Sequence, residues 1–317
     1  MQPDVRSIAE ARERLRGLVI ETPLVAWGPG VWLKCENAQV TGSFKLRGAL
    51  NKVLSLSEAE RRRGVLAASA GNHGQGVAFA ARLMGAQATI VVPDDAVRRK
   101  VEAIRRLGAD VIEVPGGYGA AESHARELSD RRGAVWISPY NDERVIAGQG
   151  TIGLEIREQL PGTAGRTVEV LVPVSGGGLV SGIGLALEGR QGYRVVGVQP
   201  ESAPYMRAAF RGEDPAAVVE LPTIADALSG PYEVGSITEH LVRRVVADMW
   251  LVSEAEILEA CRSAWVEHGL PMEPSSAVAL AAAARPAARN IERLVVVSGG
   301  NVDPKWLEGL ARREVAQ

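Results

Sequence analysis

The sequence predicts an α/β fold with mainly parallel sheets flanked by helices, and two observations carry this prediction. Short apolar, β-branched runs alternate along the chain with amphipathic stretches of helical periodicity. Runs such as TIVVP and VLVPV are apolar throughout, which is typical of parallel strands whose sheet is covered by helices on both faces.

The expected elements follow in chain order. The apolar runs predict strands at residues 31–36, 64–69, 88–93, 110–114, 134–138, 169–174, 194–199, 244–252 and 293–298. Amphipathic stretches predict helices, among them residues 75–84, 97–107 and 120–131. Two helix starts carry the capping-box pattern, in which a serine bonds the backbone three residues later: Ser57 with Glu60, and Ser253 with Glu256.

Composition excludes several classes of protein. The chain has 317 residues, is 46% hydrophobic and has a formal net charge of -2 with mixed signs, so we expect no nucleic-acid partner. No apolar stretch approaches the roughly 20 residues of a membrane span, so we expect no membrane partner. Cys35 and Cys261 form no CxxC pair, which favours a cytoplasmic location. The four histidines show no zinc spacing, and we expect no metal.

Three of the expected strands run directly into small, Gly-rich turns: ASAGNHGQG at 68–76, PVSGGGLVSG at 173–182 and VVSGGN at 296–301. Ligands of open parallel sheets bind outside the carboxyl ends of the strands. The three turns are therefore candidates for one ligand site. The alternative is that each glycine only allows a helix to pack closely on a strand.

Lys45 stands out among the lysines. The chain has only five, at positions 34, 45, 52, 100 and 305, and uses arginine for its other basic residues. Lys45 follows the turn-like TGS and precedes the helix-like LRGALNKVLSL. A positive charge at a helix N-terminus opposes the macrodipole, which suggests another use for the amine, although a solvated surface lysine remains the alternative.

Two of the Gly-rich turns suit anionic groups. SGGGL lets the backbone approach an anion closely before a helix N-terminus, as a phosphate site requires. The strict GxGxxG pattern is absent because Ser181 takes the third glycine position, which disfavours a nicotinamide dehydrogenase, although the loop alone leaves one possible. In SAGNHG, the strand-to-helix turn suits a carboxylate, and Asn72 can bond a phenolic oxygen, unless Asn72 and His73 only cap the helix.

The motifs SFKLRGA, SAGNHGQGVA, VIAGQGTIGLEI, SGGGL, EPSSAVALA and SGGNVD, in this order, resemble the fold type II pyridoxal-phosphate enzymes. The resemblance is to the threonine/serine dehydratases and serine racemase, and it covers nearly the whole chain. It implies a two-domain protein, with a discontinuous large domain at 1–39 and 142–317 and a small domain at 40–141. It also implies a homodimer.

The resemblance assigns roles to individual residues. Lys45 would form the Schiff base with pyridoxal 5′-phosphate and act as the base, with Phe44 packing near the ring. The other cofactor contacts would come from Asn72, Ser175, Gly176, Gly177, Gly178, Leu179 and Ser298, the last facing the pyridine nitrogen. The substrate would be bound by Ser69, Gly71, Asn72, His73 and Glu273.

The expected reaction is β-elimination from a small hydroxy amino acid, most simply L-threonine or L-serine, to 2-oxobutyrate or pyruvate and ammonia. In the resemblance to serine racemases, whose motif is similar to SSGNHG, Ala70 takes the position of the second serine. Its methyl group cannot deliver a proton, which disfavours racemisation. Gln199 and Tyr205 stand at the two acidic positions of the racemase metal site, which disfavours Mg²⁺ or Ca²⁺ there. A dehydratase of 3-hydroxyaspartate or of a hydroxyectoine-derived amino acid, a β-replacement enzyme and a non-catalytic binding module remain alternatives.

Overall fold

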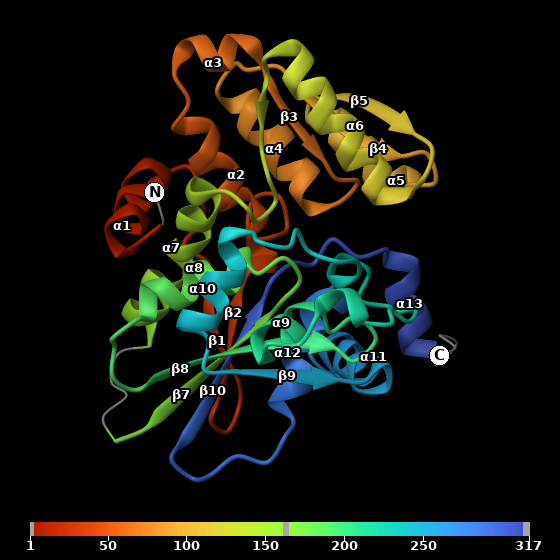
Figure 1. Ribbon diagram of the computed structural model, residues 1–317. Coiled ribbons are helices and arrows are strands. Elements are labelled where there is room, and N and C mark those ends of the chain that lie inside the picture. Colours follow the sequence, from red (N-terminus) through yellow and green to blue (C-terminus); the bar gives the residue numbers. More distant parts are fainter. Residues whose placement is uncertain (1–2, 161–164, 313–317) are drawn as a thin grey trace. The chain divides into compact units, whose positions relative to one another are not determined.

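The computed structural model describes residues 3–160 and 165–312, and the chain divides into two compact units. Unit 1 comprises residues 1–19 and 45–149, and unit 2 comprises residues 20–44 and 150–317 (Figure 1). The chain passes from unit 2 to unit 1 at the peptide bond between Phe44 and Lys45.

Unit 1 contains a parallel four-stranded sheet in the order β5-β4-β3-β6. The strands are β3 (Val65–Ala68), β4 (Ala88–Pro93), β5 (Asp110–Val114) and β6 (Val135–Trp136). The helices are α1 (Val5–Leu15), α2 (Lys45–Leu54), α3 (Glu58–Arg63), α4 (Asn72–Leu83), α5 (Arg98–Arg106), α6 (Gly117–Arg132) and the beginning of α7 (Glu143–Gln159), whose later residues belong to unit 2.

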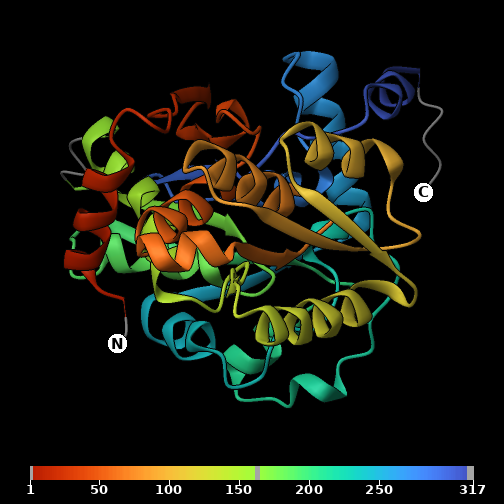
Figure 2. The same cartoon turned by 90° about the horizontal axis from the view of Figure 1, so that it is seen from above.

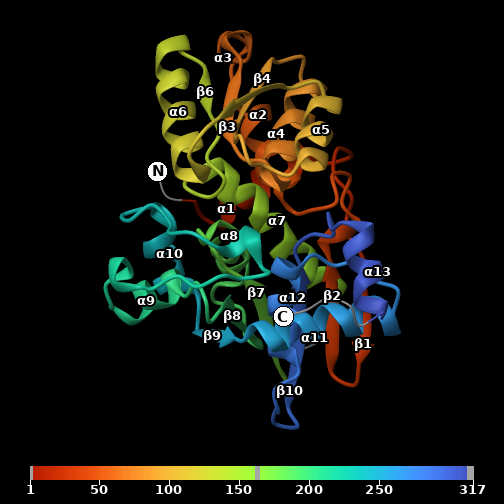
Figure 3. The same cartoon turned by 90° about the vertical axis from the view of Figure 1, so that its right-hand side faces the viewer.

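The two-residue period of the strands divides the core of unit 1 into two layers. Leu66 and Val91 pack beneath α6, whereas their neighbours Val65 and Ile90 pack beneath α2, α4 and α5. Figures 2 and 3 show α6 on one face of this sheet and α4 on the other. Because both faces of β3 and β4 are buried, these two strands have no polar side, as their sequences indicate.

Unit 2 contains a six-stranded sheet in the order β1-β2-β10-β7-β8-β9. The strands are β1 (Leu24–Gly28), β2 (Val31–Cys35), β7 (Thr167–Pro173), β8 (Tyr193–Pro200), β9 (Asp248–Val252) and β10 (Ile291–Val297). The α-helices are α8 (Gly178–Leu187), α9 (Tyr205–Arg211), α10 (Ile237–Val245), α11 (Glu254–Arg262), α12 (Pro274–Ala283) and α13 (Pro304–Arg312). Short helical turns are η1 (Glu36–Ala38), η2 (Pro215–Ala217), η3 (Asp226–Leu228) and the π-helix η4 (Ser263–Glu267).

One face of this sheet packs against α12, while α11 packs on α12 and α13 packs on α11. Leu171, Val196, Ile257 and Val278 belong to the same hydrophobic core. Helix α8 packs on β7 and β8, and α10 packs on α8. All strand pairs of the sheet are parallel except β1 with β2. The predicted α/β class with mainly parallel sheets is therefore confirmed.

Two details differ from the sequence prediction. The run at 244–252 is not a single strand, because Arg244 and Val245 close α10 and the strand β9 begins at Asp248. The antiparallel edge strand β1 was not predicted, and its residues are partly or fully exposed. The predicted domain limits stay a prediction; the compact unit that holds residues 45–149 also takes in α1. Among the described residues, no helix is both long and apolar enough to cross a membrane.

Candidate cofactor and active site

Lys45 is the first residue of α2, as the sequence predicts, and its side chain is half-buried. Its Nζ donates a hydrogen bond to the carbonyl oxygen of Pro139 at 3.1 Å. Helix α4 approaches the start of α2 closely at Gly76, where an added Cβ would lie 3.3 Å from the Lys45 carbonyl oxygen. The amine is thus held at a fixed place in unit 1 by a helix start and a backbone carbonyl.

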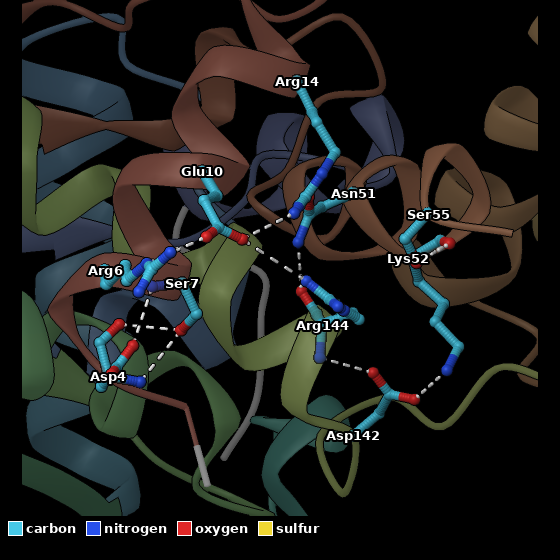
Figure 4. Close-up of polar contacts among 10 residues, drawn as sticks. All are labelled: Asp4, Arg6, Ser7, Glu10, Arg14, Asn51, Lys52, Ser55, Asp142 and Arg144. Atoms are coloured by element: carbon cyan, nitrogen blue, oxygen red, sulfur yellow. Dashed lines mark hydrogen bonds and ion pairs between the residues drawn. The ribbon is translucent and has the colours of Figure 1, made fainter. Parts of the chain in front are cut away.

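The connection that carries Pro139 is itself fixed by a polar network (Figure 4). Asp142 caps α7 by accepting hydrogen bonds from the backbone N–H groups of Arg144 and Val145 at 2.8 and 3.0 Å, and it pairs with Lys52 on α2 at 2.6 Å. Asn51, also on α2, donates to the Arg144 carbonyl at 2.7 Å. The helix that begins with Lys45 therefore also holds the segment that bears the acceptor of its amine.

Helix α1 completes this network. Arg14 donates to the Asn51 side chain at 2.6 Å, and Glu10 pairs with Arg14 at 3.2 Å and with Arg144 at 3.9 Å. Asp4 and Ser7 form a capping box at the start of α1, which the sequence analysis did not predict. The N-terminal helix α1 thus helps to hold the segment that lies near Lys45.

The SAGNHG turn lies between β3 and α4 in unit 1. The Ser69 hydroxyl accepts the N–H of Gly71 at 3.1 Å, and Asn72 is the first residue of α4. Gly71 at the N-cap has no side chain to cap the helix, and the first backbone hydrogen bond of the helix runs from Gln75 to Gly71 at 3.2 Å. The N–H groups of His73 and Gly74 consequently have no acceptor within the helix, as an anion site requires.

The ring of His73 is buried and bonded inside unit 1, unlike its backbone N–H, which is available to an anion. Burial, and after it the positive charge of Lys45, lowers the pKa of His73 to about 3, so the ring is neutral near pH 7. Its Nε2 lies 2.8 Å from the carbonyl oxygen of Ile137 and must donate, which leaves Nδ1 as a buried acceptor with no hydrogen-bond partner in the described structure. A substrate carboxylate can therefore use the backbone N–H of His73 but not its ring.

The SGGGL loop connects β7 to α8 in unit 2. Gly177 caps α8 with a left-handed φ of 81°, and a Cβ there would lie only 3.1 to 3.2 Å from Val242, Met206 and Thr238. Gly178 and Leu179 open the helix, where the leading N–H groups lack intrahelical acceptors. The loop has the glycine backbone and the helix N-terminus that a phosphate needs.

The SGGN turn after β10 lies in unit 2 with Phe44. The Ser298 carbonyl accepts the N–H of Phe44 at 3.0 Å, and Ser43 forms an isolated β-bridge with Gly299. The Ser298 hydroxyl is buried and lies 2.8 Å from the hydroxyl of Ser276 on α12. The sequence analysis missed Ser276, although a second serine in the otherwise apolar EPSSAVALA segment was a visible signal.

Glu273 is the N-cap residue of α12, and its N–H donates to the Gly299 carbonyl at 3.2 Å. Its carboxylate occupies the space beside Gly299, because a Cβ on that glycine would meet Glu273 Oε1 at 2.4 Å. A larger residue at position 299 would require the Glu273 carboxylate to move, and Glu273 lies next to the predicted cofactor residue Ser298.

The positions compared with the racemase metal site carry neutral side chains that have partners. Gln199 is buried, and its side chain bonds the Ala203 carbonyl at 3.3 Å and the Arg207 N–H at 2.8 Å. The Tyr205 hydroxyl donates to Glu220 at 2.8 Å. Within residues 3–160 and 165–312, no three His, Cys, Asp or Glu side chains form a group that could hold a metal ion.

The residues of each unit suit one part of pyridoxal phosphate. Unit 1 offers an amine for the aldehyde carbon at Lys45, and unit 2 offers a glycine cradle for the phosphate and the Ser298 hydroxyl for a ring nitrogen. A larger residue at Gly177 would be strained at a φ of 81°, and its Cβ would crowd the side chains behind it.

Comparisons with known proteins agree with this fit. The family model described as "Pyridoxal-phosphate dependent enzyme" matches residues 15–299. The chain is 41% identical to an L-threonine ammonia-lyase of Thermotoga maritima, over 98% of this chain and 78% of that protein. It is 36% identical to the catabolic L-threonine dehydratase of Escherichia coli K12, over 94% and 93% of the two chains. The structure of maize serine racemase superposes with a TM-score of 0.88 at 32% identity, covering 99% of this chain and 98% of that one. The chain therefore belongs to the pyridoxal-phosphate dependent enzymes of fold type II.

Proposed function

We propose that this chain is a pyridoxal-phosphate dependent ammonia-lyase that converts L-threonine or L-serine to 2-oxobutyrate or pyruvate and ammonia. The observation that carries the proposal is the Lys45 amine, held by the Pro139 carbonyl at the start of α2. The chain in which it lies is 41% identical to an L-threonine ammonia-lyase.

The cofactor would be held covalently by Lys45 and through its phosphate by Ser175, Gly176, Gly177, Gly178 and Leu179. Phe44 would pack near the ring, Asn72 would bond the ring oxygen and Ser298 the ring nitrogen. When bound, the cofactor supplies an electron-withdrawing ring system that makes the α-proton of an amino acid acidic.

Lys45 has a second task when its amine is not covalently engaged. A neutral amine at this position can take the α-proton of the substrate, and the Pro139 carbonyl can orient it without giving it a counter-charge. The β-hydroxyl would then take up a proton and leave, so that the α-proton accepted by Lys45 and the hydroxyl are lost together as one water molecule. Addition of one water molecule to the remaining carbon–nitrogen group would release ammonia and the 2-oxo acid. Lys45 is therefore the proposed catalytic base.

The substrate carboxylate would be held at the start of α4. The N–H groups of His73 and Gly74 point out of the helix end, and the positive end of the helix dipole favours an anion there. Ser69 and Asn72 add polar side chains to the same turn. Because His73 is neutral, the charge of the carboxylate would be compensated mainly by the helix end.

Ser298 bears on the choice of product. A hydroxyl beside the ring nitrogen, instead of a carboxylate, does not stabilise a protonated nitrogen. An unprotonated ring withdraws electrons less strongly, which favours prompt loss of the β-hydroxyl over transamination. The proposed function thus agrees with a serine at position 298.

Serine racemase is the second candidate, because the maize enzyme of that name has a very similar fold. Ala70 argues against it, since a methyl group cannot exchange a proton with Cα. A dehydratase of 3-hydroxyaspartate or of a hydroxyectoine-derived amino acid shares the proposed chemistry and differs only in the substrate side chain.

The test is an assay of 2-oxo acid release from L- and D-threonine, L- and D-serine and 3-hydroxyaspartate, with Lys45→Ala as the inactive control. We expect release from L-threonine or L-serine and none from the variant. Release from 3-hydroxyaspartate alone would contradict the proposed substrate, and equal release by Lys45→Ala would contradict the enzyme class. We also propose a cytoplasmic homodimer; the cysteines, both unpaired and buried, suit a reducing compartment, and light scattering tests the dimer.

A further inference from the structure

Ser276 is fully buried on α12, and its hydroxyl lies among three polar groups. It accepts the backbone N–H of Gly299 at 2.7 Å. It also lies 2.8 Å from the Gly299 carbonyl and 2.8 Å from the Ser298 hydroxyl. A serine has one proton, so Ser276 can donate to only one of these two oxygens at a time.

Two arrangements of the protons follow. If Ser276 donates to the Gly299 carbonyl, the Ser298 hydroxyl can donate to Ser276, and only lone pairs of Ser298 remain for a ligand. If Ser276 donates to Ser298 instead, the Ser298 proton is directed away from Ser276 and toward a ligand. The direction of the Ser276 proton thus decides whether the Ser298 proton can turn back to Ser276 or is left for a ligand.

The second arrangement leaves the Gly299 carbonyl with a hydrogen-bond donor. The Gly299 carbonyl also accepts the N–H of Glu273 at 3.2 Å, so it keeps a donor when the Ser276 proton turns to Ser298. Leaving a buried acceptor unsatisfied is costly, and this cost does not arise at the Gly299 carbonyl. A hydroxyl that itself receives a hydrogen bond is also a stronger donor.

We propose that Ser276 is a positioning residue that turns the hydroxyl proton of Ser298 toward the ring nitrogen of the cofactor. The proposal rests on the proposed function, since it takes Ser298 to be the partner of that nitrogen. Ser276 holds the ring nitrogen as an unprotonated hydrogen-bond acceptor by acting through Ser298, without touching the cofactor itself.

The test compares Ser276→Ala with Ser275→Ala. Ser275 is the adjacent buried serine of α12, whose hydroxyl accepts the N–H of Ala227 at 3.1 Å, so its removal matches the loss of a buried hydrogen bond without reaching Ser298. The apoproteins are reconstituted with pyridoxal phosphate labelled with ¹⁵N in the ring. The readouts are the ¹⁵N chemical shift and the dissociation constant of the cofactor.

We expect Ser276→Ala to displace the ¹⁵N resonance and to raise the dissociation constant about two- to tenfold, the worth of a neutral hydrogen bond. Ser275→Ala is expected to change neither. In the Ser298→Ala background, Ser276→Ala should have no further effect on either readout, because its action passes through Ser298. If Ser276→Ala does not fold, Ser276→Cys, whose thiol is a weaker donor, gives the same comparison.

Equal values for Ser276→Ala and Ser275→Ala would overturn the role of Ser276. An effect of Ser276→Ala that persists in the Ser298→Ala background would also overturn it, because the variant would then act through the Gly299 N–H alone. If the wild-type protein bound no cofactor at Lys45, the proposed function would fail instead, so the two failures are distinguishable.

Discussion

The amine of Lys45 donates to the carbonyl oxygen of Pro139 at 3.1 Å, across 94 residues of sequence. The carbonyl lies in the connection from β6 to α7, and Asp142 ties that connection to α2 through Lys52 at 2.6 Å. Helix α2 therefore fixes the positions of both Lys45 and the carbonyl that accepts its hydrogen bond.

Replacing Asp142 tests this arrangement. Asp142→Ala removes the cap of α7 and a largely buried ion pair, so we expect unfolding free energy to fall by about 1–2 kcal/mol and cofactor affinity to fall with it. Asp142→Asn keeps the cap and should lose less. Glu58→Gln breaks an exposed pair with Arg62 and serves as the control, with an expected change within about 0.5 kcal/mol. Urea unfolding checks all three, and a loss no larger than that of the control would refute the arrangement.

The neutral ring of His73 predicts a pH dependence of stability. The folded-state pKa is about 3 and the ordinary value is 6.5, so the unfolded chain binds more protons than the folded chain between these values. The stability that the folded protein gains from keeping the His73 ring neutral is complete above about pH 6.5, and it is lost as the pH falls toward 3.

His73→Gln can still donate to the Ile137 carbonyl but does not titrate. As the pH is lowered from 7 to 4, the wild type should therefore lose stability relative to this variant. The unfolding free energy of the wild type minus that of the variant should fall over this range. Other groups titrate in both proteins and cancel. A difference that stays constant over this range would show that the ring is not held neutral.

Gly177 tests the phosphate cradle. Gly177→Ala places a Cβ at a φ of 81° and within 3.1 to 3.2 Å of three side chains, so it should destabilise the fold by more than the roughly 1 kcal/mol of a left-handed alanine and weaken cofactor binding. Gly212→Ala has a similar φ of 78° and open space, so it should show only the backbone cost. Equal effects of the two variants on cofactor affinity would mean that the loop does not hold the phosphate.

Ala70 predicts the stereochemical outcome. With L-serine as substrate, chiral chromatography should detect pyruvate and no D-serine, because the half-buried Ala70 offers no proton. Ala70→Ser is the matched variant in which a hydroxyl is present. Formation of D-serine by the wild type at a rate comparable with that of pyruvate would contradict the assignment to the lyases.

Much of the fold could be predicted because its central strands, such as β4 and β7, are buried on both faces. The runs at 88–93 and 110–114 coincide with β4 and β5. The prediction of a single strand at 244–252 was wrong because an apolar run with valines also suits the buried side of a helix. Leu241 and Val242 are buried on α10, and this helix extends to Val245. Strand β1 has an apolar sequence, LVAWG, but it lies at an exposed sheet edge, and the sequence analysis did not identify it as a strand.

The candidate site divides in the same way. Lys45 at a helix start and the glycines of the SGGGL loop carry signals in their residue types, and the structure places both at helix N-termini. The acceptor of the Lys45 amine is a backbone carbonyl, which any residue at position 139 would supply, so no sequence signal exists for it. The partner of Ser298 depends on the packing of α12 against the end of β10, which local sequence does not encode.

The most direct test of the account is the covalent attachment of the cofactor to Lys45. The purified protein, incubated with pyridoxal phosphate, should absorb at about 410 nm, and borohydride reduction followed by peptide mass spectrometry should place the adduct on Lys45. Lys45→Ala should lose both the absorbance and the adduct, whereas Lys305→Ala, which removes an exposed lysine, should keep both. An adduct on another lysine, or an unchanged spectrum in Lys45→Ala, would contradict the central claim.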